Sequence, residues 1–138
     1  MIVKSFFQND TESALISQVQ WLQNEVGLSD QFFSHLLNVE EDAFCTWRAG
    51  KGVLSEEQQH TLKEFWQTML HLLSFLNFDL NRLSVMLEHV DDTKTYAIKL
   101  PFAQPWIGTS LKAYLELQGT AGIRKVNQWV QSLRFGDL

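Results

Sequence analysis

Residues 27–50 read GLSDQFFSHLLNVEEDAFCTWRAG, and this stretch decides the fold. Ser29 is a typical helix N-cap. The apolar residues after it share one helical face: Phe32, Phe33, Leu36 and Leu37. Asn38 tolerates the left-handed backbone conformation that a tight turn between two helices often needs. A second helix follows, on which Phe44 and Trp47 lie three residues apart and face inward. The stretch therefore predicts a helix-turn-helix, a shape that proteins use to read DNA.

The rest of the chain also has helical periodicity, with two prolines and seven glycines among its 138 residues. Ser55 and Gln58 have the spacing of a capping box, which starts the longest helix. Tyr96, Ile98 and Leu100 alternate with polar residues and predict a short extended segment. We expect an all-α fold with about seven helices, near residues 11–25, 29–37, 40–49, 55–77, 79–90, 110–119 and 123–133.

Three segments are expected along the chain: a helix-turn-helix bundle (1–54), a long central helix pair (55–92) and a small C-terminal helical domain (93–138). Residues 69–78, MLHLLSFLNF, are apolar almost all round the helix. A helix of this kind is central in its domain or buried against another subunit. This segment predicts a homodimer.

The net charge of −5 is unevenly distributed. Residues 1–93 hold 5 Lys/Arg against 14 Asp/Glu, a net charge of −9, while residues 94–138 hold 6 against 2, a net of +4. The acidic part lowers the affinity expected for DNA, because most non-specific binding comes from neutralising phosphates. The N-terminus lacks a signal-peptide pattern, no apolar run is long enough to span a bilayer, and a single cysteine, Cys45, excludes an internal disulfide. We expect a soluble cytoplasmic protein that has no contact with membranes.

Catalytic signatures are absent from the sequence. It has no glycine-rich phosphate loop and no HExxH, CxxC or GxSxG pattern, and its four histidines are scattered. We therefore expect no enzyme activity, no catalytic residues, no cofactor and no metal site.

Two parts of the chain resemble one family. SDQFFSHLLNVEEDAFCTWRAG resembles the Xre-type regulators, whose pattern is a cap, a helix with a small residue, a turn, and a helix that ends in Trp-x-x-Gly, here Trp47 to Gly50. WIGTSLKAYLELQGTAGIRKVNQWVQSLRFG resembles the C-terminal domain of the Xre/MbcA/ParS antitoxins. The matching positions of that domain are Gly108, Leu111, Gly119, Val126 and Phe135-Gly136, and Ser110 stands where the family usually has proline.

The resemblance implies a dimer that binds an operator through the helix-turn-helix and a toxin enzyme through the C-terminal domain. The DNA-binding residues expected are Gln31, Glu41, Asp42, Thr46, Arg48 and Lys51. Trp106 directly follows Pro105 in a loop made irregular by Pro101 and Pro105, where it either fills a gap between subdomains or contacts a partner. With it, the partner-binding residues expected are Lys112, Arg124, Lys125, Arg134 and Phe135.

The acidic start of the second helix leaves an alternative open. Glu41 and Asp42 can accept hydrogen bonds from cytosine N4, but each also repels the neighbouring phosphates. Asp30 places a further anion at the start of the first helix, where a backbone phosphate would otherwise bind. The alternative is a protein–protein interaction adaptor with a degenerate helix-turn-helix that no longer binds DNA.

Overall fold

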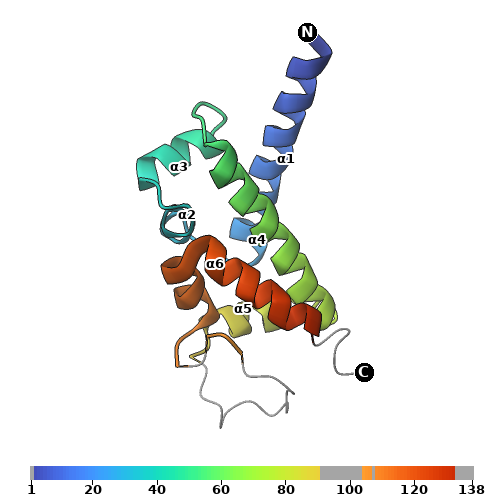
Figure 1. Cartoon of the computed structure of the whole chain (residues 1–138), viewed down its shortest axis with the longest axis vertical. Coiled ribbons are helices and arrows are strands. Elements are labelled where there is room, and N and C mark those ends of the chain that lie inside the picture. Colours follow the sequence, from blue (N-terminus) through green and yellow to red (C-terminus); the bar gives the residue numbers. More distant parts are fainter. Residues whose placement is uncertain (1, 91–103, 107, 133–138) are drawn as a thin grey trace.

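The computed structural model describes residues 2–90, 104–106 and 108–132, with side chains from residue 12 onward. These residues form six α-helices and no strand, which confirms the all-α fold class (Figure 1). The helices are α1 (Ile2–Glu25), α2 (Asp30–Leu37), α3 (Glu41–Arg48), α4 (Glu56–Phe75), α5 (Leu80–Glu88) and α6 (Leu111–Gln131).

The helix starts follow local side-chain chemistry. Ser55 accepts a hydrogen bond from the backbone N–H of Gln58, and the Gln58 side chain accepts one from the backbone N–H of Ser55, so the predicted capping box is present. Asp79 and Ser110 cap α5 and α6 in the same way, each accepting from a backbone N–H three residues on. These caps satisfy N–H groups that a helix end leaves unpaired.

The turn between α2 and α3 is made by Asn38, which has φ 55° and ψ 52°, in the left-handed region. Its backbone N–H donates to the carbonyl of His35 at 3.2 Å, and the N–H of Val39 donates to that of Ser34 at 3.0 Å. These two bonds form a Schellman motif, which closes a helix and reverses the chain direction. Gly50 ends α3 in the same conformation, with φ 85°. The predicted turn is confirmed at both positions.

One helix boundary needs correction. α1 begins at Ile2, not near residue 11, because residues 2–10 contain neither glycine nor proline and the helix continues through them. The break expected between the helices at 110–119 and 123–133 is present at Gly119, whose backbone is not helical (φ 58°, ψ −134°), and α6 consists of two helical parts joined at this kink. The extended segment expected at residues 95–100 lies outside the described residues.

One continuous hydrophobic core runs through the three segments expected from the sequence. α6 crosses the molecule and packs against both α2 and α4 (Figure 1). At the helix-turn-helix end, Phe33 stacks on Phe44 with ring centroids 5.3 Å apart, and Phe65 of α4 meets Phe33 edge-on at 5.8 Å. At the other end, Trp106 packs edge-on against Trp129 of α6 at 5.0 Å. Aromatic rings therefore join the helix-turn-helix to α4, and the loop before α6 to α6 itself.

Most of the apolar segment 69–78 is buried within the chain. Met69, Leu72, Leu73 and Leu76 are buried, whereas Leu70 is 38 % exposed and Phe78 is 70 % exposed. Packing within the chain thus buries most of the apolar side chains from which the homodimer was predicted. The homodimer stays a prediction.

Truncating Trp47 should destabilise the fold, because its indole is 1 % exposed at the end of α3. Trp47→Ala should lower the free energy of unfolding by about 3–5 kcal/mol, the usual cost of removing a buried Trp side chain. Urea denaturation followed by circular dichroism measures the change. Trp21→Ala is the control, since Trp21 is 37 % exposed and should cost much less. A Trp47→Ala protein that unfolds at the parent's urea concentration would contradict this packing role.

Candidate functional site

One face of α3 packs against the hydrophobic core, and the opposite face is exposed to solvent. Phe44 is 0 % exposed and Trp47 is 1 % exposed, and both rings pack into the core beneath the motif. On the opposite face, the side chains of Glu41, Asp42, Thr46 and Ala49 are exposed to solvent. In DNA-reading motifs these outward positions of the second helix reach the base edges. The fold therefore presents the positions that a recognition helix uses.

Five of the six residues predicted to bind DNA are exposed. Glu41, Asp42 and Thr46 lie along α3, and Lys51 is exposed just after it. Gln31 is exposed in the first turn of α2. The Thr46 hydroxyl donates to the backbone carbonyl of Asp42 at 2.8 Å. This hydroxyl must break its hydrogen bond to the Asp42 carbonyl before it can donate to a base or a phosphate.

Arg48 is placed differently from the other predicted DNA contacts. Its guanidinium forms an ion pair with the Asp30 carboxylate and donates to the Gln23 side-chain oxygen at 2.9 Å. It also lies over the Phe44 ring, 5.8 Å from the centroid, a favourable position for a cation. Its side chain is 28 % exposed. Arg48 must therefore leave Asp30 before it can contact a phosphate.

Asp30 is the centre of this polar network, which ties α1, α2 and α3 together. Its Oδ1 accepts from Gln23 Nε2 at 2.8 Å, and its Oδ2 accepts from the Cys45 thiol at 3.4 Å. The hydrogen bond from Gln23 and the neighbouring Arg48 hold the pKa of the Asp30 carboxyl below its usual value, against the opposing effect of burial. Burial, followed by the Asp30 carboxylate, raises the pKa of the Cys45 thiol, which keeps this sulfur in its less reactive protonated form.

The sequence prediction missed Gln23. Gln23 comes from α1, outside the helix-turn-helix, and nothing in its local sequence indicates a contact with Arg48 25 residues later. The sequence predicts Asp30 as a further anion at the start of α2. In the structure this charge is compensated by Arg48 and does not stand alone.

The residues predicted to bind a partner do not form one open basic face in the described part of the chain. Lys112 pairs with Glu88 at 3.0 Å, and Arg124 donates two hydrogen bonds to Glu64, both at 3.1 Å. The bonds to Glu64 raise the pKa of the Arg124 guanidinium. Lys125 is exposed. Arg134 and Phe135 lie outside the described residues.

Trp106 was expected either to fill a gap between subdomains or to contact a partner. The structure places its side chain in the core with 0 % exposure, which agrees with the first alternative and corrects its assignment as a partner contact. Its ring lies edge-on against Trp129 of α6. In this conformation Trp106 offers no surface to a partner, and its role is in the core.

Among the described residues, no three His, Cys, Asp or Glu side chains converge on a position that could hold a metal ion. None of the helices in this part of the chain combines the length and the apolar character needed to cross a membrane. The helix-turn-helix remains the site with the clearest geometry.

Comparison of the chain with models of known protein families gives no match, and comparison with curated protein sequences gives none either. The case for function therefore depends on the residues of this chain.

The Asp30 network predicts a pH dependence of stability. Because the pKa of Asp30 is lower in the folded chain than in the unfolded chain, its ionised form stabilises the fold above the unfolded pKa, and this contribution is lost as the pH falls below about 4. The free energy of unfolding should therefore drop more between about pH 5 and pH 3 in the wild type than in Asp30→Asn. Chemical denaturation at each pH measures both. An equal drop in the free energy of unfolding between about pH 5 and pH 3 in both proteins would show that this network does not stabilise the ionised form of Asp30.

Proposed function

We propose that the chain is a small non-catalytic regulator of the Xre/antitoxin kind, which reads duplex DNA with its helix-turn-helix and binds a protein partner through its C-terminal part. One observation carries the proposal: α3 is anchored by Phe44 and Trp47 and turns its other face to solvent. A recognition helix needs this arrangement, because its outer side chains must enter the major groove. The left-handed Asn38 sets the turn that projects α3 from the molecule.

Electrostatics limits how such a motif can bind. Residues 29–51 hold four Asp/Glu and two Lys/Arg, so the motif is net negative. Non-specific affinity, which comes from phosphate neutralisation, should then be weak. Affinity for a preferred site must come mainly from side-chain contacts with base edges, such as cytosine N4 with Glu41 or Asp42.

A second candidate function is the adaptor, in which the helix-turn-helix shape is kept but DNA is not bound. The ion pair between Asp30 and Arg48 favours it, because this pair withdraws one of the two cations of the motif from the surface. The two candidates therefore differ in one property that can be measured: whether the protein binds a duplex at low salt, where the attraction of phosphates is strong.

Substitutions on and after α3 test the DNA proposal. Arg48→Ala and Lys51→Ala should each weaken binding to all duplexes alike and reduce the slope of log K against log salt by about 0.9, since each removes one phosphate contact. Thr46→Ala should weaken binding to the preferred sequence more than to random DNA. Fluorescence anisotropy from about 50 mM salt upward measures both effects. Equal loss on every sequence for Thr46→Ala would assign Thr46 to the backbone instead of a base.

Two variants with the same change in charge test whether the ion pair with Asp30 restrains Arg48. Asp30→Asn removes the carboxylate that holds Arg48, so the affinity for duplex should rise, because Arg48 no longer has to break this ion pair before it contacts a phosphate, while the salt slope should stay at the wild-type value. Glu41→Gln makes the same change in charge on the exposed face of α3 but leaves the Arg48 pair in place, so its affinity for random duplex should rise less. If neither the wild type nor Asp30→Asn binds any duplex at about 50 mM salt, the DNA proposal fails and the adaptor replaces it.

We further propose that the protein is a homodimer, with contacts at the apolar surface of α1 and α4. Trp21 of α1 and Trp66 of α4 meet edge-on at 5.7 Å, and Leu70 lies one turn beyond Trp66 and is 38 % exposed. Sedimentation at micromolar concentration should give twice the 16.0 kDa chain mass. Leu70→Glu should shift the protein to monomer, while Val53→Glu, at a position that is 87 % exposed in the loop after α3, should not. A wild-type monomer would contradict the proposal.

A further inference from the structure

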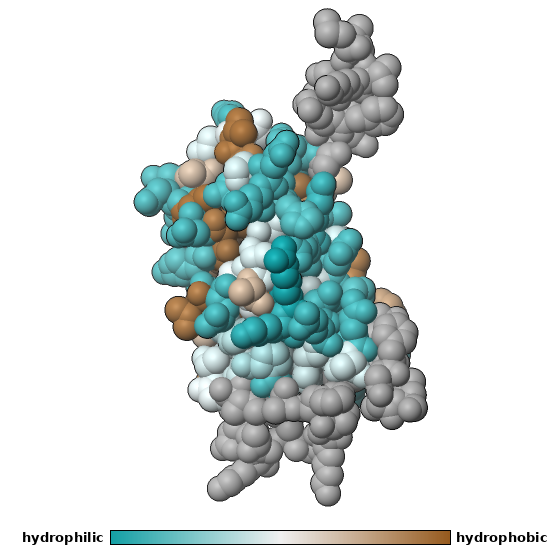
Figure 2. Space-filling view, in the orientation of Figure 1, coloured by the Kyte–Doolittle hydropathy of each residue, from teal (hydrophilic) through white to brown (hydrophobic). Residues whose placement is uncertain are grey.

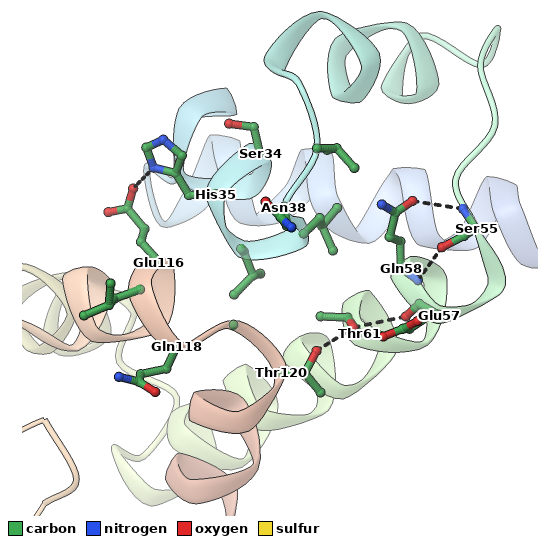
Figure 3. A pocket seen from close by; sticks show the side chains of 15 residues that line it. Ser34, His35, Asn38, Ser55, Glu57, Gln58, Thr61, Glu116, Gln118 and Thr120 are labelled. Carbon is green, nitrogen blue, oxygen red and sulfur yellow. Dashed lines mark hydrogen bonds and ion pairs between the residues drawn. The ribbon is translucent and has the colours of Figure 1, made fainter.

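A polar groove opens between the helix-turn-helix and the kink in α6 (Figure 3). It has a volume of about 650 Å³, within the range of about 300–1,000 Å³ typical of small-ligand sites. Three segments far apart in the sequence line it: residues 34–39 of α2 and its turn, residues 55–61 at the start of α4, and residues 116–120 of α6. In Figure 2 a narrow hydrophobic strip is visible in this region, between the hydrophilic side chains that cover most of this face.

The backbone at Gly119 shapes the lower wall of the groove. Gly119 has φ 58° and ψ −134°, values that break the helix and that residues with a side chain rarely adopt. A Cβ atom at this position would lie 3.4 Å from the carbonyl oxygen of Leu36, so the kink and the end of α2 approach closely. Thr120, directly after the kink, shares a hydrogen bond of 2.8 Å with Thr61 of α4. The groove is therefore built on packed elements and not on a loose loop.

The charged side chains of the lining are mostly acidic. Its fifteen residues include two carboxylates, Glu57 and Glu116, no lysine or arginine, and one histidine, His35, which contacts Glu116. On one side of the groove, the Glu116 carboxylate forms a hydrogen bond of 2.8 Å with Nδ1 of His35. On the other side, Glu57 lies beside Thr61 (Figure 3). A carboxylate offers about four acceptor positions, so Glu116 can accept from a ligand while it contacts His35.

The space between the two carboxylates is partly apolar. Leu36, Leu37 and Val39 line it from the helix-turn-helix side, and Leu117, which is 82 % exposed, lines it from α6. Neutral hydrogen-bonding groups complete the lining: Ser34, Asn38, Ser55, Gln58, Thr61, Gln118 and Thr120. A matching ligand carries positive charge at both ends and methylene groups between them.

We propose that this groove binds a linear organic cation of the polyamine class, with one ammonium group at Glu57 and another at Glu116. An anionic ligand fits poorly, because the first turn of α4 carries Glu56 and Glu57 and its N-cap is already occupied by the capping box. A bound polyamine contacts both the turn between α2 and α3 and the kink of α6. It thereby links the recognition motif to the C-terminal helix, and the site stands independently of DNA binding.

Spermidine is the probe, titrated into the full chain by isothermal calorimetry at constant ionic strength. The wild type should show saturable binding of one molecule per chain. Glu57→Gln/Glu116→Gln should weaken it by about fivefold for each carboxylate removed, the upper range for exposed ion pairs. Glu41→Gln/Asp42→Asn is the matched control, since it removes two exposed carboxylates of α3 outside the groove and should bind as the wild type does. Diacetylspermidine, which lacks both terminal charges, should bind far more weakly than spermidine.

Three results would overturn the proposal: no saturable binding to the wild type, equal affinity in the groove variant, or an equal loss in the α3 control. An equal loss in the α3 control would mean that the affinity for spermidine depends only on the net charge of the protein. Circular dichroism of each variant verifies the fold, and Glu116→Asp gives a second test that keeps the charge but shortens its reach. Because the readout is direct binding to the free protein, a negative result leaves the regulator proposal standing, and failure to bind DNA leaves this one standing.

Discussion

The contact of Phe33 with Phe44 and Phe65 is the interaction on which the rest of the structure depends. Phe33 lies on α2, Phe44 on α3 and Phe65 on α4, and the three rings are almost fully buried against one another. Because these rings fix the position of α3 relative to α4, they decide which side chains of α3 face inward and which remain in solvent. The groove beside the turn and the exposed face of α3 both follow from this packing.

Ion pairs inside the chain then decide which charges remain for partners. Arg48, Lys112 and Arg124 are each bound to a carboxylate of another helix, so much of the positive charge that the sequence offers is internally compensated. The acidic side chains at the start of α3 are exposed. The Arg48 pair removes one charge of each sign, so the motif keeps the net negative charge of its composition, with Lys51 as its other cation. The proposed DNA binding should therefore depend on base contacts and on release of Arg48.

The local features of this fold could be predicted from the sequence, and the long-range ones could not. The Asn38 turn, the Ser55 capping box and the caps at Asp79 and Ser110 depend on residues three or four positions apart, so their chemistry is visible in the sequence. The pairing of Arg48 with Asp30 spans 18 residues and that of Arg124 with Glu64 spans 60, and only the packing of helices brings them together. The same holds for Trp106, whose burial depends on its contact with α6.

We propose that the outer face of α3 is a recognition surface for DNA. Amide chemical shifts of the ¹⁵N-labelled protein, recorded as a duplex library is titrated in at about 50 mM salt, test it most directly, because they report which residues contact the nucleic acid. If α3 reads DNA, the largest chemical-shift changes should occur at Gln31, Thr46 and Lys51, with smaller changes at Arg48 and Asp30 as their ion pair opens. Unchanged shifts on α3, or shifts confined to surfaces away from the helix-turn-helix, would contradict it.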